Sequence, residues 1–202
     1  MTKINILTRT GNRETYFKTL KQSIENQTYK NIRHLKSNDN INCKYLDEEN
    51  DVLNVVKNSE LGEAFYNVYL NEIGKQVDNG WIIILDDDSK LIDNTFLEKL
   101  ADECSKSTPK EILIFQSLLL PKKVIIPSKE NFNSKKIARY GIDMACFCFH
   151  HSILKQFSFD GRKMGDLNFL EKIKKNKNFE FKFISLPIGV WGNYDGAKNG
   201  KN

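Results

Sequence analysis

Three consecutive aspartates, Asp86, Asp87 and Asp88, directly follow the apolar run WIIIL at residues 81–85. Carboxylates crowded at a strand end repel one another and raise each other's pKa unless a positive group lies among them. Positions i and i+2 of an extended segment project to one side, so Asp86 and Asp88 can face one site while Asp87 turns away. Two carboxylates completed by water and phosphate oxygens suit Mg²⁺ or Mn²⁺. The alternative is a solvated acidic turn; the apolar strand favours a metal.

A second candidate metal site lies in the run CFCFHH at residues 146–151. On a strand, Cys146, Cys148 and His150 would share one face and could bind zinc. Ligands at i and i+2 of a flat strand converge poorly, however, and free cysteine is among the most buried residue types. A buried strand therefore explains the run better. The four cysteines are also too few and too unevenly spaced for a disulfide scaffold.

The elements that must position the aspartates follow an α/β pattern. The continuous apolarity of residues 81–85 indicates a strand covered on both faces, as in a mostly parallel sheet, and ligands bind beyond the carboxyl ends of such strands. A first strand is predicted at 4–9 and a helix at about 14–26. Further strands are predicted at 31–39, 43–47, 111–121, 123–127, 142–151 and 179–187, and further helices at about 61–77, 95–104 and 165–175. The pair at 111–121 and 123–127 is predicted to form a hairpin.

Composition sets the remaining limits. The chain has 202 residues, 40% of them hydrophobic, which suits one domain spanning 1–202. The net charge of +5 is spread along the chain and is too diffuse to indicate nucleic-acid binding. No run approaches the roughly 20 apolar residues of a membrane span, and the first residues do not resemble a signal peptide. These features predict a soluble, cytoplasmic protein, and the Lys- and Asn-rich usage is typical of an AT-rich microbial or viral genome.

The order of five segments resembles the GT-A nucleotide-sugar glycosyltransferases of family 2, in which a DXD motif follows an apolar strand. The segments are INILTRTGNR, SIENQTYKNIRHLKSND, GEAFYNVYLNEIGKQVDNGWIIILDDDS, GIDMACFCFHHSI and KMGDLNFLEKI, and together they cover most of the chain. The resemblance implies a Rossmann-like GT-A domain with a mostly parallel central sheet, helices on both faces and a small acceptor-side subregion. It also implies a nucleotide-binding half at about 1–90 and an acceptor-side half at about 91–190, and the chain can be one piece of a longer multidomain polypeptide.

The resemblance assigns most site residues to the donor, expected to be a UDP-sugar. Asp39 accepts a hydrogen bond from the base, because a uracil N3–H is a donor that a carboxylate can bind. This segment ends in SNDN instead of the paired acids and glycine common in the family, so an Asx turn at Asp39 is the alternative. The residues assigned to the nucleotide-sugar are Thr8, Arg9, Arg13, Asp39, Asn67, Asp86 and Asp87, and the ligands of Mn²⁺ or Mg²⁺ are Asp86 and Asp88.

The resemblance also implies an inverting transfer of a hexosyl or deoxyhexosyl group to a saccharide or glycan hydroxyl. Asp166 is the expected base, with a plain helix N-cap as the alternative. Asp143 is the second candidate base, or it lines the acceptor pocket. The C-terminal loop at 189–202 is expected to close over the donor, with Trp191 and Tyr194 available for stacking, or else to be a frayed terminus.

Two other functions fit the aspartates. Clustered carboxylates also serve metal-dependent nucleotidyl or phosphoryl transfer, which would call for a concentrated basic groove that the sequence does not show. The other alternative is a non-catalytic module that binds a nucleotide-sugar.

Overall fold

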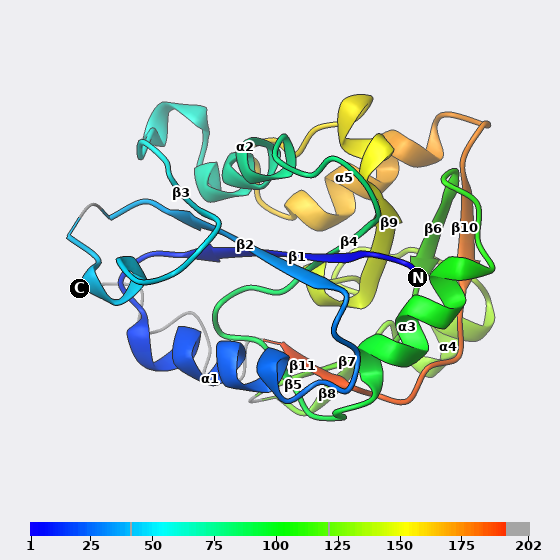
Figure 1. The fold of residues 1–202 in the computed structure, drawn as a ribbon. Coiled ribbons are helices and arrows are strands. Elements are labelled where there is room, and N and C mark those ends of the chain that lie inside the picture. Colours follow the sequence, from blue (N-terminus) through cyan, green and yellow to red (C-terminus); the bar gives the residue numbers. More distant parts are fainter. Residues whose placement is uncertain (41, 121, 193–202) are drawn as a thin grey trace.

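The computed structural model describes residues 1–40, 42–120 and 122–192, which form two β-sheets with helices packed on them (Figure 1). The central sheet has seven strands in the order β10-β6-β9-β4-β1-β2-β3, and the second has four in the order β5-β11-β7-β8. The central strands are β1 (Ile4–Thr10), β2 (Ile32–Asn38), β3 (Val52–Asn54), β4 (Trp81–Ile84), β6 (Glu111–Ile114), β9 (Phe147–His150) and β10 (Glu180–Phe183). The second sheet contains β5 (Lys90–Leu91), β7 (Ser117–Leu119), β8 (Val124–Ile126) and β11 (Val190–Gly192).

Helices cover both faces of the central sheet. The helices are α1 (Glu14–Glu25), α2 (Tyr69–Gly74), α3 (Phe96–Ser105), α4 (Lys129–Asn133) and α5 (Gly165–Lys174). Helices α2 and α5 lie on one face, whereas α1 and α3 lie on the other, together with the second sheet (Figure 1). Within the described ranges, no helix combines the length and the apolarity needed to cross a membrane.

The side chains of β4 show why this segment is apolar throughout. Ile82 and Ile84 belong to the core beneath α2 and α5, and Ile83 and Leu85 belong to the core beneath α1 and α3. All four are fully buried. Strand β1 runs parallel to both β2 and β4, while β9 runs antiparallel between β4 and β6. The predicted α/β class, with a mostly parallel sheet covered on both faces, is therefore confirmed.

Two predicted elements take another form. Residues 43–47 contain a 3-10 helix, Lys44–Leu46, and the third strand lies later, at β3. Cys43 and Leu46 pack against Phe17 of α1, so local turns satisfy a segment that is too short for a buried strand. The helix predicted at 61–77 is broken as well: 3-10 helices occupy Ser59–Leu61 and Phe65–Val68, and α2 starts only at Tyr69. Gly62, at φ 116°, lies outside the helical region and interrupts it.

The second sheet contains the remaining differences. Residues 111–121 form two strands instead of one: β6 joins the central sheet, and β7 pairs with β8 in the predicted hairpin. The strand predicted at 142–151 begins only at Phe147, because a 3-10 helix, Met144–Cys146, precedes it. The predicted C-terminal loop starts with β11, which pairs with β5 and β7. Residues 193–202, including Tyr194, lie outside the described part of the chain.

Candidate active site

Most of the predicted site residues follow the carboxyl ends of three neighbouring parallel strands. Arg9 lies near the end of β1, Asp39 follows β2, and the three aspartates follow β4. Since β1 pairs in parallel with both β2 and β4, these ends meet at one edge of the sheet. That edge is the usual ligand site of an open α/β sheet.

Arg9 and Asp86 form a two-pronged ion pair. The Nε of Arg9 donates to Oδ1 of Asp86 at 2.7 Å, and a terminal nitrogen of the same guanidinium contacts Oδ2. Arg9 also donates to the side-chain oxygen of Asn67, and its guanidinium carbon lies 5.0 Å from the centre of the Tyr66 ring. The Arg9 side chain is 12% exposed and that of Asp86 is 27% exposed, so the pair is only partly screened by solvent.

Arg13 holds the other two aspartates. Its Nε donates to Asp87 Oδ2 at 3.1 Å, a terminal nitrogen also contacts Asp87 Oδ1, and the other terminal nitrogen donates to Asp88 Oδ2 at 3.1 Å. Asp87 is fully buried, and this burial raises its pKa to about 7 although the charge of Arg13 lowers it. Burial and the charge of Asp86 likewise raise the pKa of Asp88. Two arginines therefore provide the positive charge that three adjacent carboxylates require.

Two further carboxylates lie close to this group. Asp143 accepts a hydrogen bond from the Ala145 amide at 2.9 Å and so caps the turn before β9. Its pKa is raised to about 7, first by burial and then by the negative charges of Asp166, Asp86 and Asp88. Burial also raises the pKa of Asp166, while the charge of Arg9 lowers it. We call Asp86, Asp87, Asp88, Asp143 and Asp166 the acidic cluster.

Asn67 connects Arg9 to the start of α5. It is 3% exposed, accepts a hydrogen bond from Arg9 and donates to the Arg162 carbonyl at 3.2 Å. Gly165 approaches Asn67 so closely that a Cβ at this glycine would lie 2.3 Å from the side-chain nitrogen of Asn67. Met164, just before α5, has φ 61°, a left-handed conformation that is uncommon away from glycine and often marks a functional site. The helix that carries Asp166 is therefore fastened to the same arginine that holds Asp86.

The aspartate after β2 lies against the turn after β1. A Cβ at Gly11 would lie 2.5 Å from Oδ1 of Asp39, so only a glycine fits here without a shift of this carboxylate. Burial, followed by the charge of Asp39, raises the pKa of Tyr69 to about 12. A cavity of about 500 Å³ borders the turn after β1. Its lining residues are Asn12, Arg13, Glu14, Thr15, Tyr16, Asn42, Cys43, Lys44 and Tyr45.

The structure does not bring Thr8 into the acidic cluster. Its side chain is fully buried, and its hydroxyl donates to the Leu85 carbonyl at 2.8 Å and bonds Nε2 of His34 at 2.8 Å. Thr8 therefore links β1 to both neighbouring strands. Sequence reasoning missed Tyr66, which lies against Arg9, and the signal for it was its place beside Asn67 in the GEAFYNVYL segment.

Several solved structures share this arrangement of strands and helices. S. aureus TarS 1-349 in complex with UDP superposes with a TM-score of 0.73 at 17% identity over 94% of this chain, and the same protein with UDP-GlcNAc gives 0.72 at 13% identity. The mannosyltransferase PcManGT from Pyrobaculum calidifontis, in complex with GDP-Man and Mn²⁺, gives 0.62 at 13% identity over 92% of this chain. This chain has the GT-A glycosyltransferase fold.

The likeness to these GT-A structures is one of shape. The chain spans 60%, 58% and 55% of the three matched chains, in the order given above. No protein-family model matches the sequence, and no curated protein matches it either. The predicted resemblance to GT-A enzymes is thus confirmed for the fold.

A divalent cation fits this GT-A site only if the substrate supplies part of its coordination. Within the described ranges, no three His, Cys, Asp or Glu side chains are placed to hold a metal ion. Asp86 and Asp88 offer two carboxylates close enough to repel each other, which is the set that Mg²⁺ or Mn²⁺ uses when phosphate oxygens complete the shell. The acidic cluster has five carboxylates facing two arginines, a negative surplus that a cation would offset.

The cysteine-rich run is not a zinc site. Cys146 belongs to the core beneath α5, whereas Cys148 belongs to the core beneath α3 and lies 3.9 Å from Cys104, sulfur to sulfur. The two thiols therefore face opposite sides of the sheet, because Cys146 ends a 3-10 helix and is not part of the strand. The buried-strand interpretation of this run is correct from Phe147 onward.

Proposed function

We propose that this chain is a metal-dependent, inverting glycosyltransferase that moves a sugar from a nucleotide-sugar, most simply a UDP-sugar, to a hydroxyl of a saccharide or glycan acceptor. The observation that carries the proposal is the acidic cluster at the carboxyl edge of a GT-A sheet, with Arg9 and Arg13 inside it. Structural neighbours bound to UDP, UDP-GlcNAc and GDP-Man support a nucleotide-sugar donor.

The donor half of the proposed site contains both charges that a nucleotide diphosphate needs. Asp86 and Asp88 would hold Mn²⁺ or Mg²⁺, and a cation bound there would stabilise the negative charge that develops on the leaving diphosphate. Arg9 and Arg13 occupy these carboxylates in the structure. When a cation replaces them, the guanidinium groups become free to donate to phosphate oxygens, for which their geometry is well suited. Asp39, beside Gly11, is positioned next to the sheet edge for the base.

Asp166 is the proposed general base. It lies in the first turn of α5, where one carboxylate oxygen accepts the Leu167 amide at 2.7 Å, and burial raises its pKa, which strengthens it as a base. Its helix is fastened to Arg9 through Asn67, so the base and the donor side hold a fixed relation. Asp143 is the second candidate, since a pKa of about 7 suits a base at neutral pH. One base and one displacement predict inversion at the anomeric carbon.

The test is to incubate the protein with Mn²⁺ and a panel of UDP- and GDP-sugars, with and without saccharide acceptors. A glycosyltransferase releases the nucleoside diphosphate and transfers the sugar when the acceptor is present. Release of a nucleoside monophosphate would instead indicate phosphoryl-type chemistry. Tight binding of the donor with no product under any acceptor would indicate a binding module.

A further inference from the structure

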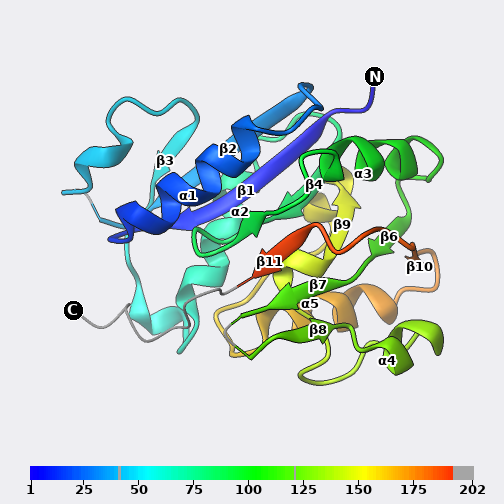
Figure 2. The ribbon, with the colours of Figure 1, turned by 90° about the horizontal axis from the view of Figure 1, so that it is seen from below.

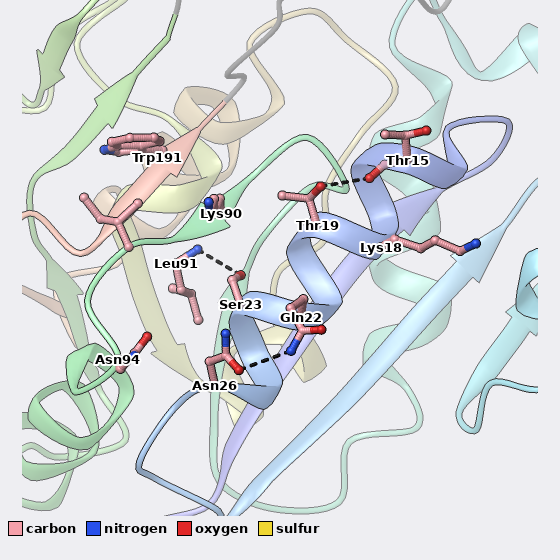
Figure 3. A pocket seen from close by; sticks show the side chains of 11 residues that line it. Thr15, Lys18, Thr19, Gln22, Ser23, Asn26, Lys90, Leu91, Asn94 and Trp191 are labelled. Atoms are coloured by element: carbon pink, nitrogen blue, oxygen red, sulfur yellow. Dashed lines mark hydrogen bonds between the residues drawn. The ribbon is translucent and has the colours of Figure 1, made fainter.

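A second, larger cavity of about 950 Å³ lies between α1 and the second sheet (Figure 3). One wall is the side of α1, and the other comes from β5, the segment after it and β11. The lining residues are Thr15, Lys18, Thr19, Gln22, Ser23, Asn26, Lys90, Leu91, Ile92, Asn94 and Trp191. Figure 2, which views the molecule from the side of the second sheet, shows α1 and β11 next to each other at this place.

The two walls are fixed to each other. The Leu91 amide of β5 donates to the hydroxyl of Ser23 on α1 at 3.1 Å, and this bond is drawn in Figure 3. Strand β11 pairs with β5, with Trp191 opposite Lys90. Because hydrogen bonds hold both walls, the cavity is formed before any ligand binds, as most ligand sites are.

The cavity borders the acidic cluster on three sides. Thr15 lies two residues after Arg13, and Lys90 lies two residues after Asp88. Gly192, next to Trp191, approaches the cluster so closely that a Cβ there would lie 3.5 Å from Oδ1 of Asp143. The cavity therefore starts at the proposed catalytic centre and continues along α1 away from it.

Its chemistry is that of a site for a charged carbohydrate. No carboxylate lines the cavity, and the Lys90 ammonium makes no hydrogen bond or ion pair within the described ranges. Lys18 contributes its stem, while its ammonium pairs with Glu14 at 2.6 Å and points away from β5 in Figure 3. The partly exposed Trp191 ring offers a flat apolar surface, and amide side chains such as Asn94 offer donors and acceptors.

We propose that this cavity binds the acceptor, and that the acceptor is a glycan or polyol chain bearing a phosphate or carboxylate group. Lys90 pairs with the anionic group, and Trp191 packs against the adjoining sugar or polyol unit. The neighbouring acidic cluster repels anions, so the charged unit is directed toward Lys90 and the reacting hydroxyl toward Asp166. This inference rests on the proposed function, because it names the acceptor class of the same site.

The tryptophans of the chain provide a direct measurement. The chain has two, and Trp81 is 5% exposed, so a ligand-dependent change in fluorescence reports mainly on Trp191. We would titrate the full chain with trigalacturonate against neutral maltotriose, and with glucose 6-phosphate against glucose, each at low and high salt. The expected result is that both charged sugars change the fluorescence more tightly than their neutral counterparts, with affinity falling as salt rises. The carboxylate and phosphate pairs distinguish the two sources of charge.

Variants assign the effect to the cavity. Lys90→Gln should weaken binding of the charged sugars by about tenfold or more, the usual worth of a charge-assisted bond, and should raise the KM for acceptor. Lys90→Arg should keep most of the affinity. Lys110→Gln, at an exposed lysine that does not line the cavity, is the matched control and should change nothing.

Three outcomes would overturn the inference. Equal affinity for charged and neutral sugars would remove the role of charge, and unchanged binding in Lys90→Gln would remove the role of Lys90. Weaker UDP binding in Lys90→Gln, measured with Mn²⁺ by calorimetry, would assign Lys90 to the donor. The same calorimetry on the unaltered chain separates the two proposals: if UDP binds and charged sugars do not, only this inference fails, and if UDP does not bind, the proposed function fails.

Discussion

Replacing Arg9 with Gln should strengthen Mn²⁺ binding in the absence of nucleotide and weaken the binding of UDP. In the structure the Arg9 guanidinium occupies the carboxylate of Asp86, so a cation must displace it. Two unit charges about 4 Å apart attract by about 4 kcal/mol at the effective dielectric near a protein surface. Because Asp86 is 27% exposed, we reduce this to about 1–2 kcal/mol, a 5- to 30-fold change in Kd.

The assay is calorimetric titration of Mn²⁺, of UDP, and of each in the presence of the other. In the unaltered chain, Mn²⁺ and UDP should tighten each other's binding by one common factor, as linkage requires. That factor should shrink in Arg9→Gln, since the competitor for Asp86 is gone. Arg33→Gln is the matched control, because Arg33 forms a similarly exposed pair with Asp51 on β2, away from the site. Mn²⁺ affinity that is unchanged or weaker in nucleotide-free Arg9→Gln would refute the competition between the arginine and the cation.

Three further predictions concern the carboxylates. Asp86→Asn and Asp88→Asn should each abolish Mn²⁺-dependent UDP binding without loss of thermal stability, and normal UDP affinity in both variants would contradict the metal assignment. Asp166→Asn should keep donor binding but lower transfer by about 10²- to 10⁴-fold, and NMR of the product of the unaltered chain should show an inverted anomeric centre; a wild-type rate would shift the role to Asp143. The folded-state pKa of Asp143 is about 7, above its ordinary value of 3.8, so the folded state binds the extra proton between these values and stability falls as pH rises through them. The melting temperature should therefore drop less between pH 5 and pH 8 in Asp143→Asn than in the unaltered chain, and equal drops would show that the carboxyl is not buried and protonated as described.

The parts of the fold that the sequence predicts are those with a strong local signal. The run WIIIL followed by DDD identifies β4 and its ligand edge, because a strand buried on both faces has no polar alternation to obscure it. Helices α1, α3 and α5 and strands β1, β2 and β10 appear where the periodicity places them, within a few residues. Strands of three residues, such as β3 and β11, have no such signal, since their partners determine them and the pattern is too short to repeat.

The candidate site shows the same division. The sequence identifies the aspartates after β4 and asks for a positive partner, but it does not say which one. Arg9 and Asp86 are 77 residues apart, and an ion pair between them depends on the parallel pairing of β1 with β4. Asp143 likewise joins Asp166 and the β4 aspartates only through the turn that precedes β9, whose 3-10 form the sequence did not predict. Tertiary contacts of this kind become visible once the sheet order is known.

The pairing of Arg9 and Arg13 with the three aspartates has a consequence for how the chain folds. A group of adjacent carboxylates with no counter-charge would oppose folding until a metal arrived, and the protein would then depend on the metal supply for its stability. Here two side chains of the same polypeptide provide the counter-charge, and the most buried member, Asp87, is already held by Arg13. We therefore expect a chelator to leave the melting temperature unchanged while it removes UDP binding, whereas a drop of several degrees would mean that a bound metal contributes to the native fold. A newly made chain can then reach its native state first and acquire its cation together with the nucleotide.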